Sequence, residues 1–342
     1  MTAHRDLKNI IRDRQRKTGE SYTAARLHVL QAQAELLGVA AEPAAPMASP
    51  QRCEAAILKV NDRSVKAQIL GESEQLTFRT GDMWTAVPGQ IATLIIKKRW
   101  TWRGDAYASG NIESAYIDAA KLGLVPLPLR GGELDDLRRS TEPYRRPDPY
   151  APLWRKLTSR PRPSYEMDPI AWGTFPGADP EDNPTCDAAE LAETGDVDGA
   201  RELLMETLAR DLRCIDAHAH LGNHVFQRSP ERAILHYEVG MRIAELSLPR
   251  GFDGFLAWGP IYNRPYLRCL HGYGLCLWRL RRFSEAAKVF ERILSLNPND
   301  NQGVRFCLHD AQHELSWEDM HDREERAHAN LRAPRQDDLE IN

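Results

Sequence analysis

Small and large residues recur at a fixed spacing in residues 267–300, and this pattern constrains the fold more than any other feature of the chain. Gly274 and Ala286 are small, Phe290 is large, and Pro298 closes the segment. Two antiparallel helices need small residues where their backbones approach, and large residues to fill the space beside them. A proline cannot continue a helix, so Pro298 marks the end of the second one. The spacing therefore predicts a helical hairpin.

Two imperfect copies of this spacing precede it, in the windows 181–214 and 215–247. The matching residues are Ala200 and Leu204 in the first copy, and Leu221, Gly222, Ala233 and Tyr237 in the second. With these positions the chain resembles the tetratricopeptide repeat family over about 120 residues of its C-terminal half. The resemblance implies three repeats stacked as an all-α solenoid, a capping segment at 302–330, and binding of a protein or peptide partner rather than catalysis.

In that family the first helix of each repeat lines a groove that binds peptides. The resemblance implies five groove residues here: Asn223, Phe226, Arg268, His271 and Trp278. Asn223 matches the asparagine that, in some members, hydrogen-bonds the backbone of a bound peptide. The full set of basic residues that clamps a C-terminal carboxylate is missing. We therefore expect a mixed groove that takes an extended or helical peptide by aromatic anchoring.

An aromatic insertion, residues 249–266, separates the second and third copies and departs from the family pattern. Its aromatic residues are Phe252, Phe255, Trp258, Tyr262 and Tyr266. Such insertions often line the binding face, because loops carry function. An aromatic plug that fills a gap in the stack would have the same composition. Both interpretations stay open at this point.

Asp216, His218 and His220 match the hydrophobic-D-x-H-x-H signature of metal-dependent amidohydrolases. The segment, however, follows an amphipathic helix and continues as one, and the 122 residues after His220 are too few to complete a (β/α)₈ barrel. On a helix, Asp216, His220 and His224 share one face and form a zinc candidate that lacks a fourth ligand. We predict no metal, no cofactor and no enzymatic activity.

Residues 52–118 change to a period of two, with turn residues such as Pro88-Gly89 between the runs. Several short strands in so few residues predict a small, mostly-β barrel. The stretch VPGQIATLIIKKRW, which starts at Val87, resembles the pattern of OB-like and similar small barrels, where a Pro-Gly turn starts a strand that ends in basic residues.

Cations and indoles gather where this strand ends, at Lys97, Lys98, Arg99, Trp100, Trp102 and Arg103. Aromatic rings beside phosphate-binding cations are how single-stranded nucleic acids are held. A strand edge guarded by lysine, with its tryptophans packed inward, would give the same residues. The rest of the barrel has nearly equal numbers of positive and negative charges, which weighs against binding of nucleic acid. Nucleic acid is kept as the alternative partner.

The remaining segments connect these units. Residues 1–37 are predicted to form a helical hairpin, and they resemble short helical pieces that precede diverse bacterial proteins of unclear role. Residues 38–51 are an Ala/Pro/Ser linker, residues 119–180 a Pro/Arg-rich connector, and residues 331–342 a tail. The fold class expected is thus an α+β multidomain protein with a helical hairpin, a barrel and a solenoid.

Composition narrows the classes further. The 45 Lys+Arg and 49 Asp+Glu give a formal net charge of −4, so no global field points to nucleic acid or to an anionic membrane. No secretory signal or membrane-spanning run is recognisable, and the six cysteines form no CxxC pair, which predicts free thiols in a cytoplasmic protein. The preferred function is a modular protein-binding adaptor of open oligomeric state, ahead of a nucleic-acid-associated protein and a metal-dependent hydrolase.

Overall fold

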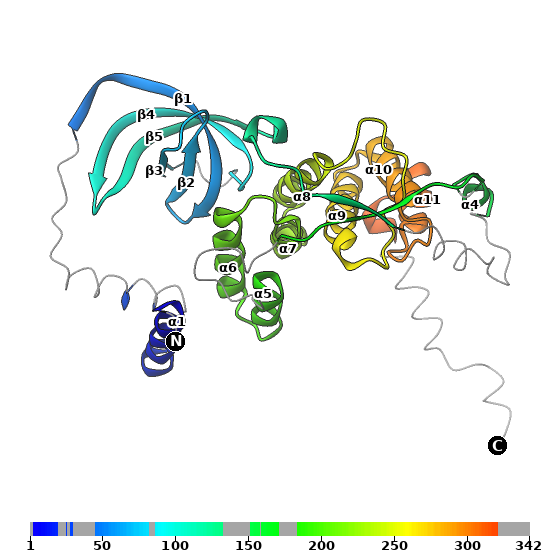
Figure 1. Cartoon of the computed structure of the whole chain (residues 1–342), viewed down its shortest axis with the longest axis horizontal. Coiled ribbons are helices and arrows are strands. Elements are labelled where there is room, and N and C mark those ends of the chain that lie inside the picture. Colours follow the sequence, from blue (N-terminus) through cyan, green and yellow to red (C-terminus); the bar gives the residue numbers. More distant parts are fainter. Residues whose placement is uncertain are drawn as a thin grey trace.

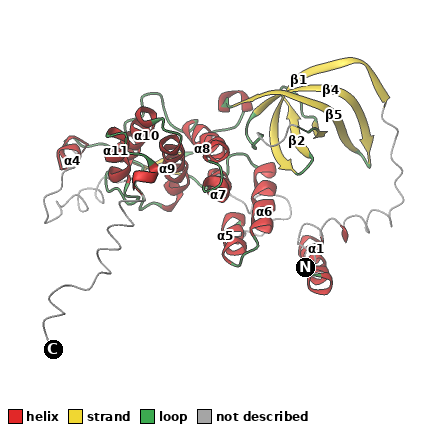
Figure 2. Cartoon of the chain, turned by 180° about the vertical axis from the view of Figure 1, so that it is seen from behind, coloured by secondary structure: helices red, strands yellow, loops and turns green. Residues whose placement is uncertain are grey.

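The computed structural model describes residues 3–19, 25, 28–29, 45–81, 86–132, 151–157, 159–170 and 183–320. It contains an N-terminal helix, a closed five-stranded barrel and a C-terminal array of helices (Figure 1). The predicted α+β fold class is thereby confirmed. In a view from behind, the barrel lies at the α6–α8 end of the array, and α10 and α11 lie toward the other end (Figure 2).

The N-terminal helix α1 (Ala3–Thr18) ends where Gly19 adopts a left-handed φ of 72° and donates to the carbonyl of Gln15. Ile11 is buried against Ala25 and Val29, two residues of the second predicted helix. Most of that second predicted helix lies outside the described residues, so the hairpin stays a prediction.

Five strands close the barrel in the order β1-β2-β3-β5-β4. They are β1 (Ala45–Asn61), β2 (Ser64–Ile69), β3 (Gln75–Arg79), β4 (Ile91–Trp102) and β5 (Asp105–Tyr116). The pair β3–β5 is parallel and the other pairs are antiparallel. Alternate side chains such as Ile57, Phe78 and Leu94 are fully buried, because a strand turns successive side chains to opposite faces.

The predicted linker 38–51 is wrong over residues 45–51, which extend β1 along β4. Ala45 pairs with Arg99 and Gln51 with Ile96, across an irregularity between them. The reason lies in β4, a long strand whose backbone groups need partners beyond the compact part of the barrel. A composition of Ala, Pro and Ser carries no local signal for that pairing.

Seven helices of the C-terminal half are described in full, and the chain enters another at Trp317. They are α5 (Pro184–Glu193), α6 (Val197–Arg210), α7 (Ile215–Phe226), α8 (Pro230–Glu245), α9 (Arg264–Arg279), α10 (Phe283–Leu296) and α11 (Val304–Gln312). The window 181–214 holds α5 and α6, the window 215–247 holds α7 and α8, and the window 267–300 holds most of α9 and all of α10.

Large rings fill notches above glycine in this array. A Cβ atom on Gly222 or Gly272 would come within 2.6 or 2.3 Å of the Tyr237 ring, and one on Gly274 within 2.5 Å of the Phe290 ring. The small-and-large pattern of the sequence therefore acts as expected, because only glycine lets these helices approach so closely.

The predicted connector 119–180 is more structured than its composition indicates. It contains η2 (Ala119–Leu122), β6 (Leu129–Gly132), α4 (Ala151–Leu157) and β7 (Ser164–Met167). Strands β6 and β7 pair antiparallel, and Met167 is buried in the helical core. The Asn263 side chain holds this sheet to the insertion, since it donates to the Tyr165 carbonyl and accepts from the Met167 N–H.

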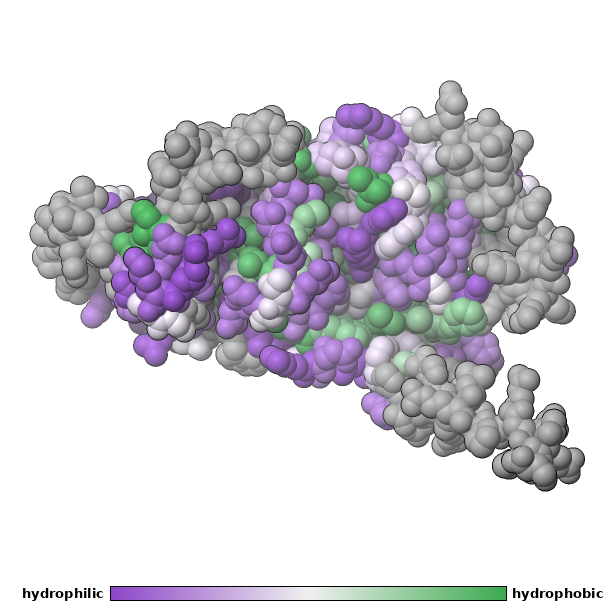
Figure 3. Space-filling view, turned by 90° about the horizontal axis from the view of Figure 1, so that it is seen from below, coloured by the Kyte–Doolittle hydropathy of each residue, from purple (hydrophilic) through white to green (hydrophobic). Residues whose placement is uncertain are grey.

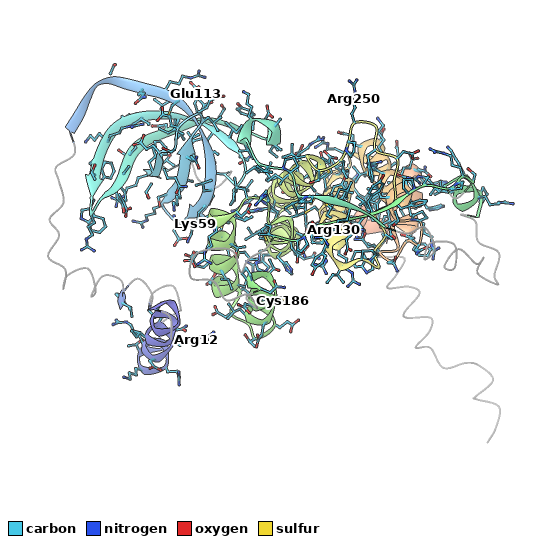
Figure 4. The ribbon with its side chains drawn as sticks, viewed as in Figure 1. Arg12, Lys59, Glu113, Arg130, Cys186 and Arg250 are labelled. Atoms are coloured by element: carbon cyan, nitrogen blue, oxygen red, sulfur yellow. The ribbon has the colours of Figure 1, made fainter. Side chains whose placement is uncertain are left out.

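The barrel and the first repeats share one hydrophobic core, which runs from the strands to α5, α6, α7 and α8. Gly89, with a φ of +86°, touches the repeats so closely that a Cβ atom there would lie 2.3 Å from Val239 Cγ1. Lys59 of β1 reaches toward α6 and pairs with Glu202 at 2.6 Å (Figure 4). The barrel is thus docked on the helices.

No helix among the described residues is long and apolar enough to cross a membrane. Viewed from below, the described surface is mainly hydrophilic and its hydrophobic residues lie in scattered spots (Figure 3).

Candidate functional site

Helices α7 and α9 lie side by side and carry two of the five predicted groove residues, Asn223 and Arg268, on a common surface. Arg268 Nη1 lies 2.8 Å from Asp216 Oδ1, so an ion pair links the first helices of two successive repeats. Burial alone would raise the pKa of Asp216, but the hydrogen bond with His220 and the charge of Arg268 lower it overall. We name this region, with Asn223 and Leu275, the α7–α9 surface.

Asn223 is exposed on the α7–α9 surface and its carboxamide is held in one orientation. The Tyr237 hydroxyl donates to Asn223 Oδ1 at 2.6 Å. Tyr237 is itself fixed in the notch formed by Gly222 and Gly272. No group among the described residues accepts from Asn223 Nδ2, so its two N–H donors are available to a ligand.

His271 lies beneath the same surface rather than on it. Burial lowers the pKa of His271 to about 4, which keeps the ring neutral at pH 7. Its Nδ1 lies 3.3 Å from Gln302 Nε2, and its ring meets Phe290 edge to face. The structure gives His271 a supporting position, with Gln302 as the polar group beside it.

Phe226 and Trp278, the two predicted aromatic anchors, are covered by the chain itself. Phe226 is 9% exposed and Trp278 is 2% exposed. The ring of Trp317 packs edge to face on both, at 5.8 Å from Phe226 and 5.2 Å from Trp278. Trp317 was not among the predicted groove residues, although a tryptophan beside the helix-capping pattern Ser316–Asp319 is a usable signal.

The insertion divides into buried and surface aromatics. Phe255 and Tyr266 are buried, and the ring of Phe252 packs against that of Tyr165 at 5.3 Å. These three residues thus occupy positions that suit an aromatic plug filling a gap in the stack. Tyr262 is exposed. Trp258 is half-buried, with the guanidinium groups of Arg264 and Arg268 at 5.3 and 5.9 Å from its ring.

The hydrolase signature is not assembled into a site. Asp216 and His220 lie on the α7–α9 surface, 3.7 Å apart, whereas His218 is fully buried and its Nε2 lies 3.1 Å from the Leu212 carbonyl. Residues two apart on a helix point in different directions. Among the described residues, no group of three His, Cys, Asp or Glu side chains could hold a metal ion. The structure thus does not bring Asp216, His218 and His220 together, and the Asp216, His220 and His224 stripe stays an untested prediction.

At the far end of the barrel hairpin β4–β5, three rings form an aromatic platform: Trp100, Trp102 and Tyr107. Trp100 stacks on Tyr107 at 5.6 Å and 17°, and Trp102 meets Tyr107 edge to face at 6.1 Å. Arg79 of β3 lies over both Trp100 and Tyr107, and Arg103 lies 4.3 Å from the Trp102 ring.

The structure separates the predicted cluster 97–103 into different environments. Lys97 donates to Asn111, Arg99 pairs with Glu74 at 3.2 Å, and Lys98 is exposed on the strand. Arg79 and Tyr107 were missed by the sequence analysis. The Arg103-Gly104 turn could have revealed Tyr107, because a tight hairpin there places it opposite Trp100.

Comparison with known proteins gives one family match. Residues 267–300 match the model of the tetratricopeptide repeat. No curated protein matches the chain. The matched residues are those in which the regular spacing is clearest, and they include most of α9 and all of α10.

Proposed function

The chain contains a tetratricopeptide repeat, and from this premise we propose that it is a non-enzymatic adaptor that binds a protein partner through the α7–α9 surface. Repeats of this family generally mediate protein–protein interactions and are typically non-catalytic. The partner would lie across the first helices of the second and third repeats.

The observation that carries this proposal is the orientation of Asn223. Its oxygen is engaged by the Tyr237 hydroxyl, which leaves its N–H groups to donate to a backbone carbonyl of a peptide. A donor that is fixed before binding loses less conformational entropy when the ligand arrives. The adjacent pair of Arg268 and Asp216 offers charges of both signs to the side chains of that peptide.

Asn223→Ala should abolish retention of the partner, whereas Lys288→Ala, an exposed change on α10, should leave it intact. Tyr237→Phe gives a sharper test, because it keeps the ring in its notch and removes only the hydroxyl that orients Asn223. The measurement is quantitative affinity capture from nuclease-treated lysate of the host, followed by titration of the recovered protein. A partner that binds the wild type and the three variants equally would refute the α7–α9 surface as its site.

A second candidate function is binding of single-stranded nucleic acid on the aromatic platform. It is favoured by the two arginines that lie against the platform, since stacked rings with adjacent cations suit bases and phosphates together. The barrel would then bind nucleic acid while the repeats recruit a protein.

Fluorescence anisotropy with a labelled single-stranded oligonucleotide tests this candidate. Trp100→Ala should weaken binding by about 1–3 kcal/mol, the value of one base stacked on a ring. Arg52→Ala is the control, because Arg52 pairs with Glu113 elsewhere on the barrel. Affinity should fall steeply as salt is raised. Equal binding by both variants, or no dependence on salt, would rule out the platform.

A further inference from the structure

The segment after α11 turns back over the first helices of the repeats. Helix α11 ends at Gln312, and Glu314 has a left-handed φ of 53°, which reverses the direction of the chain. The Leu315 N–H donates to the Asp310 carbonyl, and a new helix begins at Trp317. This turn brings Trp317 into contact with Phe226 of α7 and Trp278 of α9, which belong to the second and third repeats.

The receiving pocket consists of Phe226, Trp278 and Arg279, which we name the Trp317 pocket. Two edge-to-face ring contacts hold the indole, and Trp278 Nε1 donates to the Leu315 carbonyl at 2.7 Å. The Arg279 guanidinium lies 4.8 Å from the Phe226 ring and 5.5 Å from the Trp317 ring. It also donates to the carbonyls of Phe226 and Gln227, which fixes it over the pocket.

The inserted segment has its own local order. Ser316 Oγ accepts from the Asp319 N–H, and Asp319 Oδ2 accepts from the Ser316 N–H, so the two residues cap the helix start reciprocally. The pair of Arg281 and Glu318, 3.8 Å apart, is exposed by 71% and 73% and adds little to the docking. The contacts are therefore concentrated on one aromatic side chain and one carbonyl, as in the anchoring of a short peptide.

We propose that the Trp317 pocket is a binding site for a capped helix start that carries tryptophan in its first turn, and that this chain's own residues 315–320 occupy it in cis. A partner segment of the same chemistry would have to displace Trp317. The inference rests on the proposed peptide-binding function of the repeats, but it concerns different residues from Asn223 and Tyr237.

Competition in cis determines the affinity that such a partner shows. A segment joined by a few residues has an effective concentration on the order of millimolar at its site. A free peptide whose intrinsic Kd is about 100 μM would therefore bind the intact chain about 10-fold more weakly than a chain whose pocket is open.

The test uses a fluorescently labelled peptide of residues 314–320, titrated by anisotropy against the full chain and its Trp317→Ala variant. The variant should bind the peptide about 10-fold more tightly than the wild type. A peptide with alanine in place of its tryptophan should bind neither chain. This control changes only the peptide, so its result does not depend on the folding of a variant protein.

Two further variants guard against a fold effect. Trp317→Phe keeps a ring in the pocket and should give an affinity between those of the wild type and Trp317→Ala. Asn223→Ala, added to Trp317→Ala, should leave peptide affinity unchanged, which separates this site from the α7–α9 surface. Equal affinity of the wild type and Trp317→Ala, or absence of peptide binding to both, would show that Trp317 is only a structural cap and would overturn the proposal.

Discussion

At the scale of single residues, burial decides what the histidines of the repeats can do. Burial lowers the pKa of His218 to about 4 and that of His236 to about 3. Both rings lie inside the protein, His218 at the junction with the barrel loop and His236 on α8. His218, which belongs to the hydrolase-like signature of the sequence, is thus packed inside the protein, where burial favours the neutral imidazole.

These two histidines predict a loss of stability in acid. Between pH 6.5 and about 4 the unfolded chain takes up protons on them and the folded chain does not, so stability is full above pH 6.5 and falls below it. Each should contribute a slope of up to about 1.4 kcal/mol per pH unit. Urea unfolding at a series of pH values measures it. His236→Gln should reduce the slope, whereas His313→Gln, on the surface, should not; an unchanged slope in the first variant would refute the assignment.

At the scale of helices, aromatic rings set in glycine notches hold one repeat against the next. Tyr237 of α8 lies between Gly222 of α7 and Gly272 of α9, so a single ring fixes the spacing of three helices. This contact also positions Asn223, which couples the packing of the repeats to the surface proposed to bind peptide.

Gly272→Ala should therefore destabilise the repeats even though alanine is the better helix former. The added Cβ would lie 2.3 Å from the Tyr237 ring, and overpacking of this kind costs about 1–3 kcal/mol. Thermal unfolding followed by circular dichroism measures the change. Gly259→Ala is the control, because nothing lies within 4 Å of a Cβ at that position. If Gly272→Ala instead stabilises the chain, the Tyr237 ring can move to make room for the added Cβ atom, and the prediction is wrong.

At the scale of the whole molecule, the barrel and the helices share a core. The loop with Gly89 and the ion pair between Lys59 and Glu202 join two units that a modular interpretation would leave independent. A partner on the repeats and a ligand on the barrel would thus be held at a set distance, unlike modules on a flexible linker.

Gly89→Ala should uncouple the two units. The wild type should unfold in one transition, and the variant in two, because a Cβ at Gly89 would lie 2.3 Å from Val239 Cγ1. Gly104→Ala is a matched control: its φ of +84° is close to the +86° of Gly89, but nothing lies within 4 Å of the added Cβ. Calorimetry of the three chains compares them. If both variants unfold alike, backbone strain rather than docking explains the effect.

Much of the fold could be predicted from local patterns. A period of two indicated the barrel, and small residues at fixed spacing from large ones indicated the repeat at 267–300, because each pattern reports the face that its own element buries. Asn223 and Arg268 lie in different hairpins, and only the resemblance to the tetratricopeptide repeat family, not a local pattern, implied that they share a groove.

Only the tertiary structure decided which distant residues meet. It paired residues 45–51 with β4, brought Arg79 of β3 over Trp100, and placed Trp317 on Phe226 and Trp278. Each of these contacts joins residues far apart in sequence or lying on different elements, and each depends on burial that no local periodicity encodes. The sequence thus determined which elements form and which faces they bury, whereas the packing of those faces determined which side chains remain available to a partner.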